Sequence, residues 1–397
     1  MNILLFDSAV REALLPLTYT RPVGSLRIGS LTIAEKWQRR TGARVSFFTQ
    51  DYLQAKFPPI RADRNVLLDG SYLPTDALLA EIEESASNTV YRSEGEVVFA
   101  SLDRLQLEQH METGEWDGLS PVDLPARDFF RITRPSDLFS QNDRAIREDF
   151  ALLTRDRTSA ELPASNILIG PRDQLFIESG VTVEACTFNT TTGPIYLGED
   201  AVILEGGRFR GPIAVNAGAV LKMGANIYGA TTIGNYCKVG GEVNNVVFHS
   251  NSNKGHEGFL GNAVVGQWCN LGAGTNASNL KNDYSEVKVW SYPHGERRPS
   301  GLQFHGLVMG DHSKAGINTL FNTGTVAGVS ASIFGPGFQP DFIPSFTWGG
   351  KETNETYRLE KAVATAERVM QRRGESFTDN DRAIFEAIFA ATRKYRR

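Results

Sequence analysis

The sequence predicts an α/β domain, followed by a parallel β-solenoid and a short helical tail. Glycine usage predicts the solenoid, because 28 of the 38 glycines fall between residues 162 and 345. In this stretch an aliphatic residue recurs at every sixth position, as at Ile227, Ile233 and Val239. Before the glycine-rich part, strand-like runs alternate with helical ones, which is typical of a parallel α/β sheet.

A period of six residues is typical of a hexapeptide β-helix. Each short strand places one aliphatic side chain in the interior, and each corner needs a residue that tolerates positive φ, such as glycine. Three hexapeptides make one triangular coil, and the coils stack. The alternative is a glycine-rich antiparallel sandwich, but its strands would alternate with period two. We expect the β-helix to span residues 165–345.

The flanking regions predict further elements. The α/β domain is expected over residues 1–158, with buried strands at 2–6, 44–49 and 65–68 and helices at 33–40, 75–85 and 137–154. A linker at 159–165 follows it. The tail, at 353–397, has apolar residues at helical spacing, which predicts two amphipathic helices over 355–373 and 379–395.

Composition narrows the functional classes. A net charge of −5 and 41% hydrophobic residues exclude a collagenous, disordered or supercharged chain. The mild acidity gives no general attraction to nucleic acid or to an anionic membrane, so we expect neither as a partner. No apolar run is long enough for a membrane span, and the first residues do not resemble a signal peptide. The three cysteines form no CxxC, which favours a reducing compartment, and we expect the cytoplasm.

The loop after the first strand is the first candidate site. It contains three arginines and two glycines: Arg11, Arg21, Arg27, Gly24 and Gly29. Ligands of doubly wound sheets bind beyond the carboxyl ends of the strands. Arginine makes paired hydrogen bonds to phosphate, and glycine lets backbone N–H groups approach it. The loop therefore suits a polyphosphate, although a basic surface loop explains the same residues.

This loop resembles the opening of sugar-1-phosphate nucleotidyltransferases, in Pro16-Leu17-Thr18, Arg21-Pro22, Arg27 and Gly29. The family's Gly-x-Gly-Thr-Arg is replaced by Asp7-Ser-Ala-Val-Arg11, and its lysine after proline by Val23. The resemblance implies an NTP and a sugar 1-phosphate as substrates and Mg²⁺ as cofactor. The substrate-binding residues that it implies are Arg11, Thr18, Arg21 and Arg27.

The resemblance also implies two metal ligands. The first is Asp69 in Val66-Leu-Leu-Asp69-Gly70, which follows a strand as the family's aspartate does. The second is Asn142, with Asp143 as its alternative. A plain turn at Asp69-Gly70 accounts for the same residues, and the domain is short for this family.

The repeat is interrupted over residues 243–262 and again after Leu271. Solenoid interruptions commonly form loops on a binding face. His256 lies in the first interruption among glycine, lysine and glutamate rather than in an apolar stripe. Histidine titrates near neutral pH, so a loop histidine is a candidate general base. A plain surface histidine is the alternative.

The stretch from Lys254 to Asn279 is similar to the acetyltransferase domain of GlmU-type bifunctional enzymes. It carries the His, the Leu-Gly-Ala-Gly-Thr and an Asn at corresponding places, with Phe259 where the family has tyrosine. The resemblance implies that His256 is the general base and that Asn279 holds the sugar or orients the histidine. The other residues that it implies are Glu242, Lys254 and Lys281 for the substrate, and Ala273 and Gly274 for acetyl-CoA.

The whole layout resembles a divergent GlmU-like group, with a Rossmann-like nucleotidyltransferase domain, a left-handed parallel β-helix and C-terminal helices. It implies a homotrimer that acetylates glucosamine 1-phosphate and makes UDP-N-acetylglucosamine. One alternative is another sugar-1-phosphate nucleotidyltransferase, such as a thymidylyltransferase, and a second is an acetyltransferase with a regulatory nucleotide-binding domain. A zinc hydratase with three histidines at a trimer interface is a remote third; its candidate ligands are His249, His256, His294, His305 and His312.

Overall fold

The computed structural model describes residues 1–125 and 129–396. They form two compact units. The first unit comprises Met1–Leu14, Thr20–Leu26 and Leu31–Arg134, and the second comprises Leu15–Tyr19, Arg27–Ser30 and the chain from Pro135 onward. The boundaries expected from the sequence, near residues 158, 165 and 345, stay predictions.

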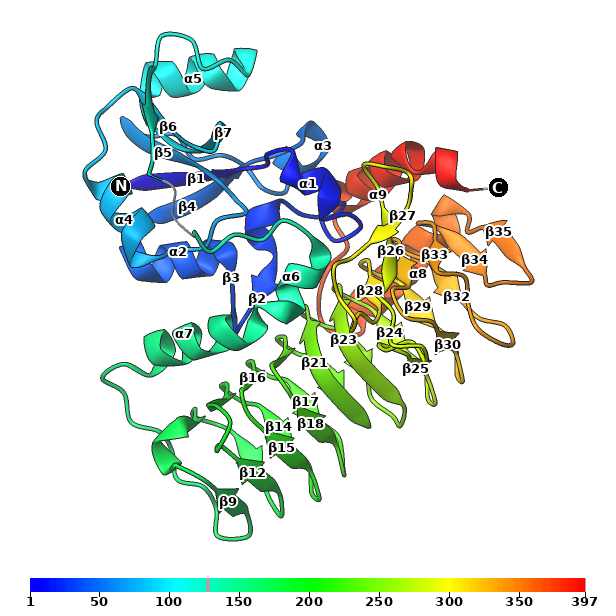
Figure 1. Ribbon diagram of the computed structural model, residues 1–397. Helices are drawn as coiled ribbons and strands as arrows, with labels where there is room; N and C mark the ends of the chain where they lie inside the picture. Colours follow the sequence, from blue (N-terminus) through cyan, green and yellow to red (C-terminus); the bar gives the residue numbers. More distant parts are fainter. Residues whose placement is uncertain (126–128, 397) are drawn as a thin grey trace. The chain divides into compact units, whose positions relative to one another are not determined.

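The first unit is built on a six-stranded sheet of order β4-β1-β5-β7-β6-β8 (Figure 1). Its strands are β1 (Asn2–Phe6), β4 (Arg44–Phe48), β5 (Arg64–Asp69), β6 (Thr89–Ser93), β7 (Glu96–Asp103) and β8 (Ser120–Asp123). Strands β4, β1 and β5 are parallel, as the alternation of strands and helices predicts. Strand β7 runs antiparallel to both of its neighbours, so the sheet as a whole is mixed.

Two helices of the first unit lie close to their predicted ranges, α2 (Ile33–Thr41) and α4 (Asp76–Glu83). Three further helices were not predicted: α1 (Val10–Ala13), α3 (Asp51–Gln54) and α5 (Arg104–Thr113). Helix α2 begins with a reciprocal capping box between Thr32 and Glu35, which satisfies two backbone N–H groups at its start. It ends at Gly42 in the left-handed conformation. The predicted Rossmann-like class of this region is confirmed.

The helix predicted over 137–154 is two helices in the second unit, α6 (Pro135–Ser140) and α7 (Asn142–Thr154). The chain leaves the helical path at Gln141. The next residue, Asn142, donates its side-chain N–H to the carbonyl of Ala230 at 2.7 Å and accepts from Gly29 N–H at 2.7 Å. These long-range bonds explain why local periodicity did not reveal the break.

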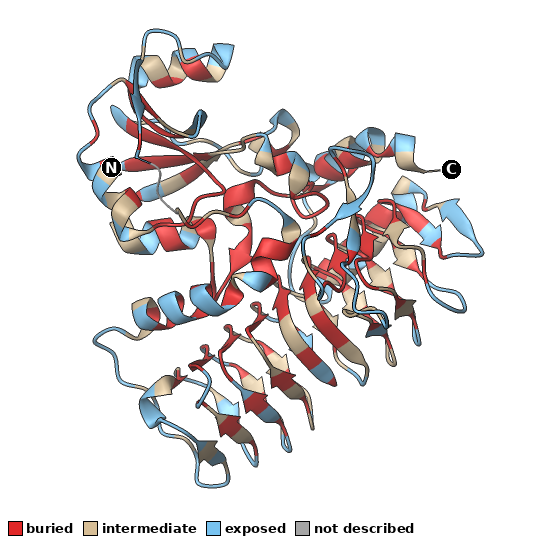
Figure 2. Ribbon diagram, viewed as in Figure 1, coloured by how far each residue is buried: buried red, intermediate tan, exposed pale blue. Residues whose placement is uncertain are grey.

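The main part of the second unit is a left-handed parallel β-helix, as predicted. Its strands pair in parallel with partners 18 residues apart, as in Ile195↔Ile213↔Thr231 and in Val202↔Val220↔Lys238. Eighteen residues are three hexapeptides, so each coil is one turn of the triangle. Aliphatic and aromatic side chains fill the interior, and most of them are fully buried. Figure 2 shows buried residues along the coils.

The segment 243–262, predicted to interrupt the repeat, stays within the β-helix. It forms β21 (Glu242–Phe248), β22 (Asn253–Lys254) and β23 (Phe259–Val265), all paired in parallel with neighbouring coils. The coil is shortened to 15–17 residues, so the hexapeptide period is lost while the register is kept. The longest inserted segment comes later in the chain. It contains the antiparallel hairpin of β26 (Lys288–Ser291) and β27 (Glu296–Pro299), which lies in the sequence between strands of the β-helix that pair with each other.

The stacked interior makes a direct prediction about stability. In β17 (Val220–Leu221) the side chain of Leu221 is fully buried, whereas Val220 is partly exposed. We expect Leu221→Ala to lower the free energy of unfolding by about 2–5 kcal/mol, because it removes apolar contacts and leaves a cavity. Val220→Ala is the matched control and is expected to cost less than half as much. Urea denaturation of both variants measures this; equal losses would contradict the triangular interior.

Two helices end the chain, α8 (Leu359–Gln371) and α9 (Asp379–Ala391), and both were predicted. The first residues of the predicted helix at 355–373 instead form strand β35 (Asn354–Thr356), paired with β34 (Thr347–Gly349). The Arg373 guanidinium donates to the Asn253 side chain at 2.9 Å and to the Tyr236 carbonyl at 3.0 Å. In the part of the chain that the structure describes, no helix has the length and apolar character needed to cross a membrane.

Candidate functional site

Two buried carboxylates meet at the carboxyl ends of β1 and β5 in the first unit. Asp7 follows β1, and Asp69 is the last residue of β5, paired with Phe6. Both side chains are almost fully buried, and the charge of Asp69 helps to raise the pKa of Asp7. Carboxyl ends of parallel strands are where ligands bind in sheets of this type.

Each carboxylate is held by protein donors. Asp69 accepts from the Ser71 N–H at 2.9 Å and from its hydroxyl at 2.7 Å, and forms an ion pair with Arg131 at 3.1 Å. Asp7 accepts from the Thr49 hydroxyl at 2.5 Å and the Val23 N–H at 2.8 Å. Burial nevertheless raises the pKa of both carboxyls, since desolvation outweighs these bonds.

The carboxylate pair fits a magnesium ion held together with substrate phosphate. Mg²⁺ is bound in such sites by one or two carboxylates plus phosphate oxygens and water. Two interacting carboxylates with pKa values raised by burial are stabilised by an added cation, and Arg131 is the cation now paired with Asp69. Within residues 1–125 and 129–396, no group of three or more His, Cys, Asp or Glu side chains is placed to hold a metal ion.

The predicted phosphate-binding residues divide between the two units. Arg11 and Arg21 belong to the first unit, whereas Thr18 and Arg27 belong to the second; all four are buried. The Arg11 guanidinium lies 3.6 Å from Asp7 and donates to the Tyr52 hydroxyl at 2.6 Å. Arg11 therefore belongs to the carboxylate cluster. The substrate roles of all four residues stay predictions.

The predicted second metal ligand, Asn142, has other partners. Its amide oxygen accepts from Gly29 N–H at 2.7 Å and from the Thr232 hydroxyl at 3.3 Å, and its amide nitrogen donates to Ala230. The side chain is fully buried. Asn142 belongs to the second unit, and Asp69 belongs to the first. Its alternative, Asp143, forms an ion pair with Arg147 on the surface of α7. The metal-ligand roles of Asn142 and of its alternative Asp143 stay predictions.

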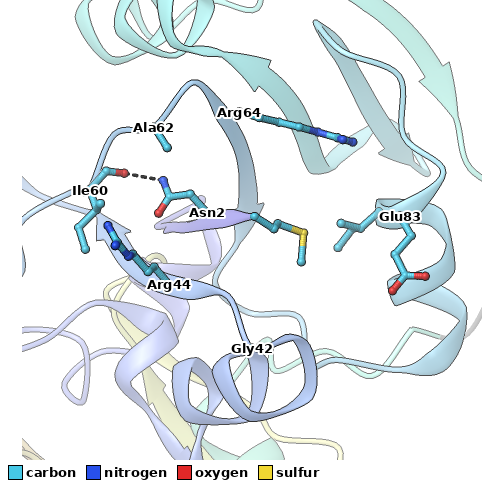
Figure 3. Close-up of a pocket in the computed structure, with 9 residues that line it drawn as sticks. Asn2, Gly42, Arg44, Ile60, Ala62, Arg64 and Glu83 are labelled. Carbon is cyan, nitrogen blue, oxygen red and sulfur yellow. Dashed lines mark hydrogen bonds between the residues drawn. The ribbon is translucent and has the colours of Figure 1, made fainter.

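A cavity of about 660 Å³ lies at the opposite edge of the same sheet (Figure 3). It is lined by the first residues of the parallel strands, Asn2, Arg44 and Arg64, and by Glu83 at the end of α4. A strand of five residues spans roughly 16 Å, so this cavity is distinct from the carboxylate pair at the other edge. We do not assign it to the predicted nucleotide site.

The predicted acetyl-transfer residues lie on consecutive coils of the β-helix. His256 is exposed and lies in the turn between β22 and β23. Asn279 follows β25 (Asn276–Ala277), which pairs with β23, and its amide nitrogen donates to the Asn262 side chain at 2.7 Å. No hydrogen bond joins the two side chains in the described part of the chain. Their catalytic roles stay predictions.

Lys254 lies in the interior of the β-helix. Its side chain is 1% exposed, and its ammonium donates to the carbonyls of Gly240 and His256, each at 3.0 Å. Burial lowers the pKa of Lys254 to about 8, although Glu257 and Glu242 act in the opposite direction. The predicted contact with a sugar phosphate stays a prediction, and the described residues give the ammonium protein partners instead.

The lowered pKa of Lys254 predicts how stability depends on pH. The pKa is about 8 in the folded chain and 10.5 for an ordinary lysine, so between these values the unfolded chain binds more protons. The free energy of unfolding contributed by Lys254 therefore rises as pH increases from 8 towards 10.5. Relative to the Lys254→Met variant, the wild type is expected to gain stability over this interval. Urea denaturation across it checks the sign; a difference that is constant with pH would contradict it.

Two further predicted residues lie on exposed or partly exposed surface. Glu242 accepts a hydrogen bond from the Tyr228 hydroxyl at 2.5 Å, which helps to raise the pKa of that tyrosine to about 12. The Lys281 ammonium donates to the Glu286 carbonyl at 2.7 Å within the loop that leads into the hairpin. Both stay predictions as substrate-binding residues.

The Gly272-Ala273-Gly274 corner was expected to approach acetyl-CoA through its backbone N–H groups. Gly272 N–H donates to Ala315 at 2.9 Å, and Gly274 N–H donates to Glu257 at 3.0 Å. Among the described residues, the Ala273 N–H has no acceptor. Gly274 has φ +71°, and a Cβ there would lie 2.1 Å from the Asn318 side-chain oxygen, so this corner requires glycine. The roles of Ala273 and Gly274 toward acetyl-CoA stay predictions.

Sequence reasoning missed two residues of the carboxylate site. Asp7 ends the first strand as Asp69 ends the third parallel strand, so the same signal was present twice. Arg131 had no local signal, because it reaches Asp69 from 62 residues along the chain and is ordered by stacking over the Tyr72 ring at 4.7 Å.

The first unit thus has buried carboxylates at the ligand-binding edge of a Rossmann-like sheet, and the second is built on a left-handed β-helix. Comparison with known proteins indicates a transferase. Residues 3–158 match the family model described as sugar nucleotidyl transferase.

Curated relatives are similar over shorter segments. A bifunctional sugar-1-phosphate nucleotidylyltransferase/acetyltransferase of Sulfurisphaera tokodaii is 36% identical over 93 residues, 23% of each chain. GlmU of Synechococcus elongatus is 30% identical over 111 residues, 28% of this chain and 20% of that one. GlmU of Methanocaldococcus jannaschii is 30% identical over 92 residues, 23% and 22%. The matches thus span about a fifth to a quarter of these relatives, and over these segments the chain is similar to GlmU-type proteins.

Proposed function

We propose that this protein is a bifunctional transferase that acetylates an amino sugar 1-phosphate and transfers a nucleotidyl group to the resulting sugar 1-phosphate. Glucosamine 1-phosphate, acetyl-CoA and UTP are the proposed substrates, and UDP-N-acetylglucosamine is the product. The observation that carries the proposal is the union, in one chain, of a sugar nucleotidyl transferase match over residues 3–158 and a β-helix bearing His256. We propose a cytoplasmic homotrimer.

In the nucleotidyl transfer, a sugar phosphate oxygen attacks the α-phosphorus of the NTP and pyrophosphate leaves. Asp69, with Asp7 beside it, would hold Mg²⁺, which when bound neutralises charge on the phosphates. Arg11 and Arg21 supply positive charge in the same unit. Arg131 is paired with Asp69 and orients that carboxylate, and its positive charge lowers the pKa of Asp69 against the larger effect of burial.

In the acetyl transfer, the sugar amine attacks the thioester carbonyl, the C–S bond breaks and the CoA thiolate leaves. His256 takes the proton from the amine, since a protonated amine cannot attack. Asn279, on the neighbouring coil, holds the sugar. The Ala273 N–H donates to the carbonyl oxygen as negative charge develops on it.

A matrix of NTPs, sugar phosphates and acetyl-CoA, analysed by mass spectrometry, tests the proposal. We expect mass gains of one acetyl group and one nucleotidyl group, with pyrophosphate released. Pyrophosphate release with TTP in place of UTP would change the assigned nucleotide and identify the thymidylyltransferase alternative. Absence of acetylated product with every amino sugar phosphate would refute the acetyl-transfer half.

A second candidate keeps the acetyl transfer and makes the first unit a sensor of nucleotide. It is favoured by Asp7-Ser-Ala-Val-Arg11 in place of the family's glycine-rich loop and by the ion pair that occupies Asp69. In that case acetyl transfer responds to added nucleotide, and no NTP yields pyrophosphate.

A further inference from the structure

Lys254 occupies a place in the β-helix that elsewhere holds aliphatic side chains. It pairs with Val239 of the preceding coil, and the interior around it includes Val239 and Leu271. An ammonium group in such surroundings is costly unless it is hydrogen-bonded. The hydrogen bonds that offset the cost of burying this ammonium therefore have to be identified.

Its bonds join two successive coils at one corner. The ammonium donates to the Gly240 carbonyl in one coil and to the His256 carbonyl in the next, each at 3.0 Å. Gly241, at φ +71°, leaves the space for it: a Cβ there would lie 2.7 Å from the Lys254 nitrogen and 2.8 Å from the His256 carbonyl oxygen. The corner is built around the ammonium.

The Lys254 ammonium is the hydrogen-bond donor to one carbonyl of the turn that carries His256, the carbonyl of His256 itself. Three consecutive carbonyls of the turn accept hydrogen bonds from neighbouring segments. Gly274 N–H donates to Glu257 at 3.0 Å, and Glu242 N–H donates to Gly258 at 3.2 Å. Those two donors are backbone groups of adjacent coils, whereas the donor to the His256 carbonyl is the Lys254 side chain.

We propose that Lys254 is a positioning residue that fixes the His256 turn, rather than a contact for the sugar phosphate. The proposal rests on the proposed function in that His256 is the base of the acetyl transfer. Lys254 acts through the backbone of His256: its bond to the carbonyl sets the direction in which the imidazole leaves the turn. A base misplaced by about 1 Å commonly loses much of its rate effect.

The chain contains a matched control in Lys314. Its ammonium likewise joins two coils, donating to the Trp268 carbonyl at 2.6 Å and to the His312 carbonyl at 2.9 Å. Burial lowers the pKa of Lys314 to about 8, as it does for Lys254. Lys314 bonds no residue of the His256 turn, so its removal tests the loss of such a cross-link by itself.

The experiment compares Lys254→Met and Lys314→Met in the full-length protein. Methionine fits an apolar interior and keeps the length of the side chain, so both variants are expected to fold. For Lys254→Met we expect kcat of acetyl transfer to fall by about 10- to 100-fold while KM for the amino sugar phosphate changes less than about 3-fold. Hydrogen exchange of the Glu242 and Gly274 amides, which donate to the Gly258 and Glu257 carbonyls of the turn, should accelerate by about 10-fold or more. Lys314→Met should leave kcat and that exchange unchanged.

Three results would overturn the proposal. A raised KM with unchanged kcat would show that Lys254 binds substrate. Unchanged exchange of the Glu242 and Gly274 amides, or the same acceleration in Lys314→Met, would show that Lys254 does not specifically hold the turn. If the wild type transfers no acetyl group, the proposed function fails, and hydrogen exchange still decides whether Lys254 fixes the turn.

Discussion

His256→Ala is expected to reduce acetyl transfer by about 10²- to 10⁴-fold, the range that a general base contributes. The physical reason is that the sugar amine needs a group to take its proton as it attacks the thioester. The histidine is exposed and its ring has no hydrogen-bond partner among the described residues, so the free energy of unfolding should change by less than about 0.5 kcal/mol. Release of the CoA thiol measures the rate.

The matched control is His294→Ala. His294 is also exposed, and its Nδ1 forms a hydrogen bond with the Ser291 hydroxyl at 2.8 Å in the hairpin, outside the His256 turn. It should keep full acetyl transfer. Nucleotidyl transfer should be normal in both variants. Acetyl transfer retained by His256→Ala would remove this histidine from the mechanism.

Asp69→Asn is expected to reduce nucleotidyl transfer by about 10²-fold or more while acetyl transfer is retained. Asparagine keeps the shape of the side chain and can still accept from Ser71, but it loses the negative charge that pairs with Arg131 and would hold Mg²⁺. Losing one group that stabilises charge in a transition state commonly costs 10²–10³-fold. Pyrophosphate release measures the effect.

Asp123→Asn is the control for this variant. Asp123 is exposed at the end of the edge strand β8 of the same sheet, so its charge is screened by water. It should keep the wild-type rate. Normal pyrophosphate release by Asp69→Asn would exclude Asp69 as the metal ligand, and a parallel loss in Asp123→Asn would indicate a general effect of charge.

Periodicity carried the prediction of the fold because each coil of a β-helix repeats the same local requirement. The aliphatic residues at Ile227, Ile233 and Val239 occupy successive sides of one coil, so the hexapeptide pattern predicts the pairing directly. The break at Gln141 was missed because its cause is tertiary: Asn142 bonds to Gly29 and Ala230.

The candidate sites were predictable only in part. Asp69 was visible as an acidic residue at the end of an apolar run, but its partner Arg131 comes from a distant segment with no motif. Lys254 was chosen because lysine suits phosphate, and its burial depends on which positions of a shortened coil face inward. Composition and spacing do not reveal which of these positions face inward. The register of β22 with β20 (Lys238–Val239) shows it, because Lys254 pairs with the buried Val239.

The hairpin formed by β26 and β27 shows how the β-helix accommodates added chain. Asn270 pairs with Lys314 although the two are 44 residues apart in sequence, whereas Val220 and Lys238 are separated by 18. The β-helix therefore accommodates an inserted segment between two strands that remain paired. Insertions of this kind can change during evolution without altering the strand pairing of the β-helix.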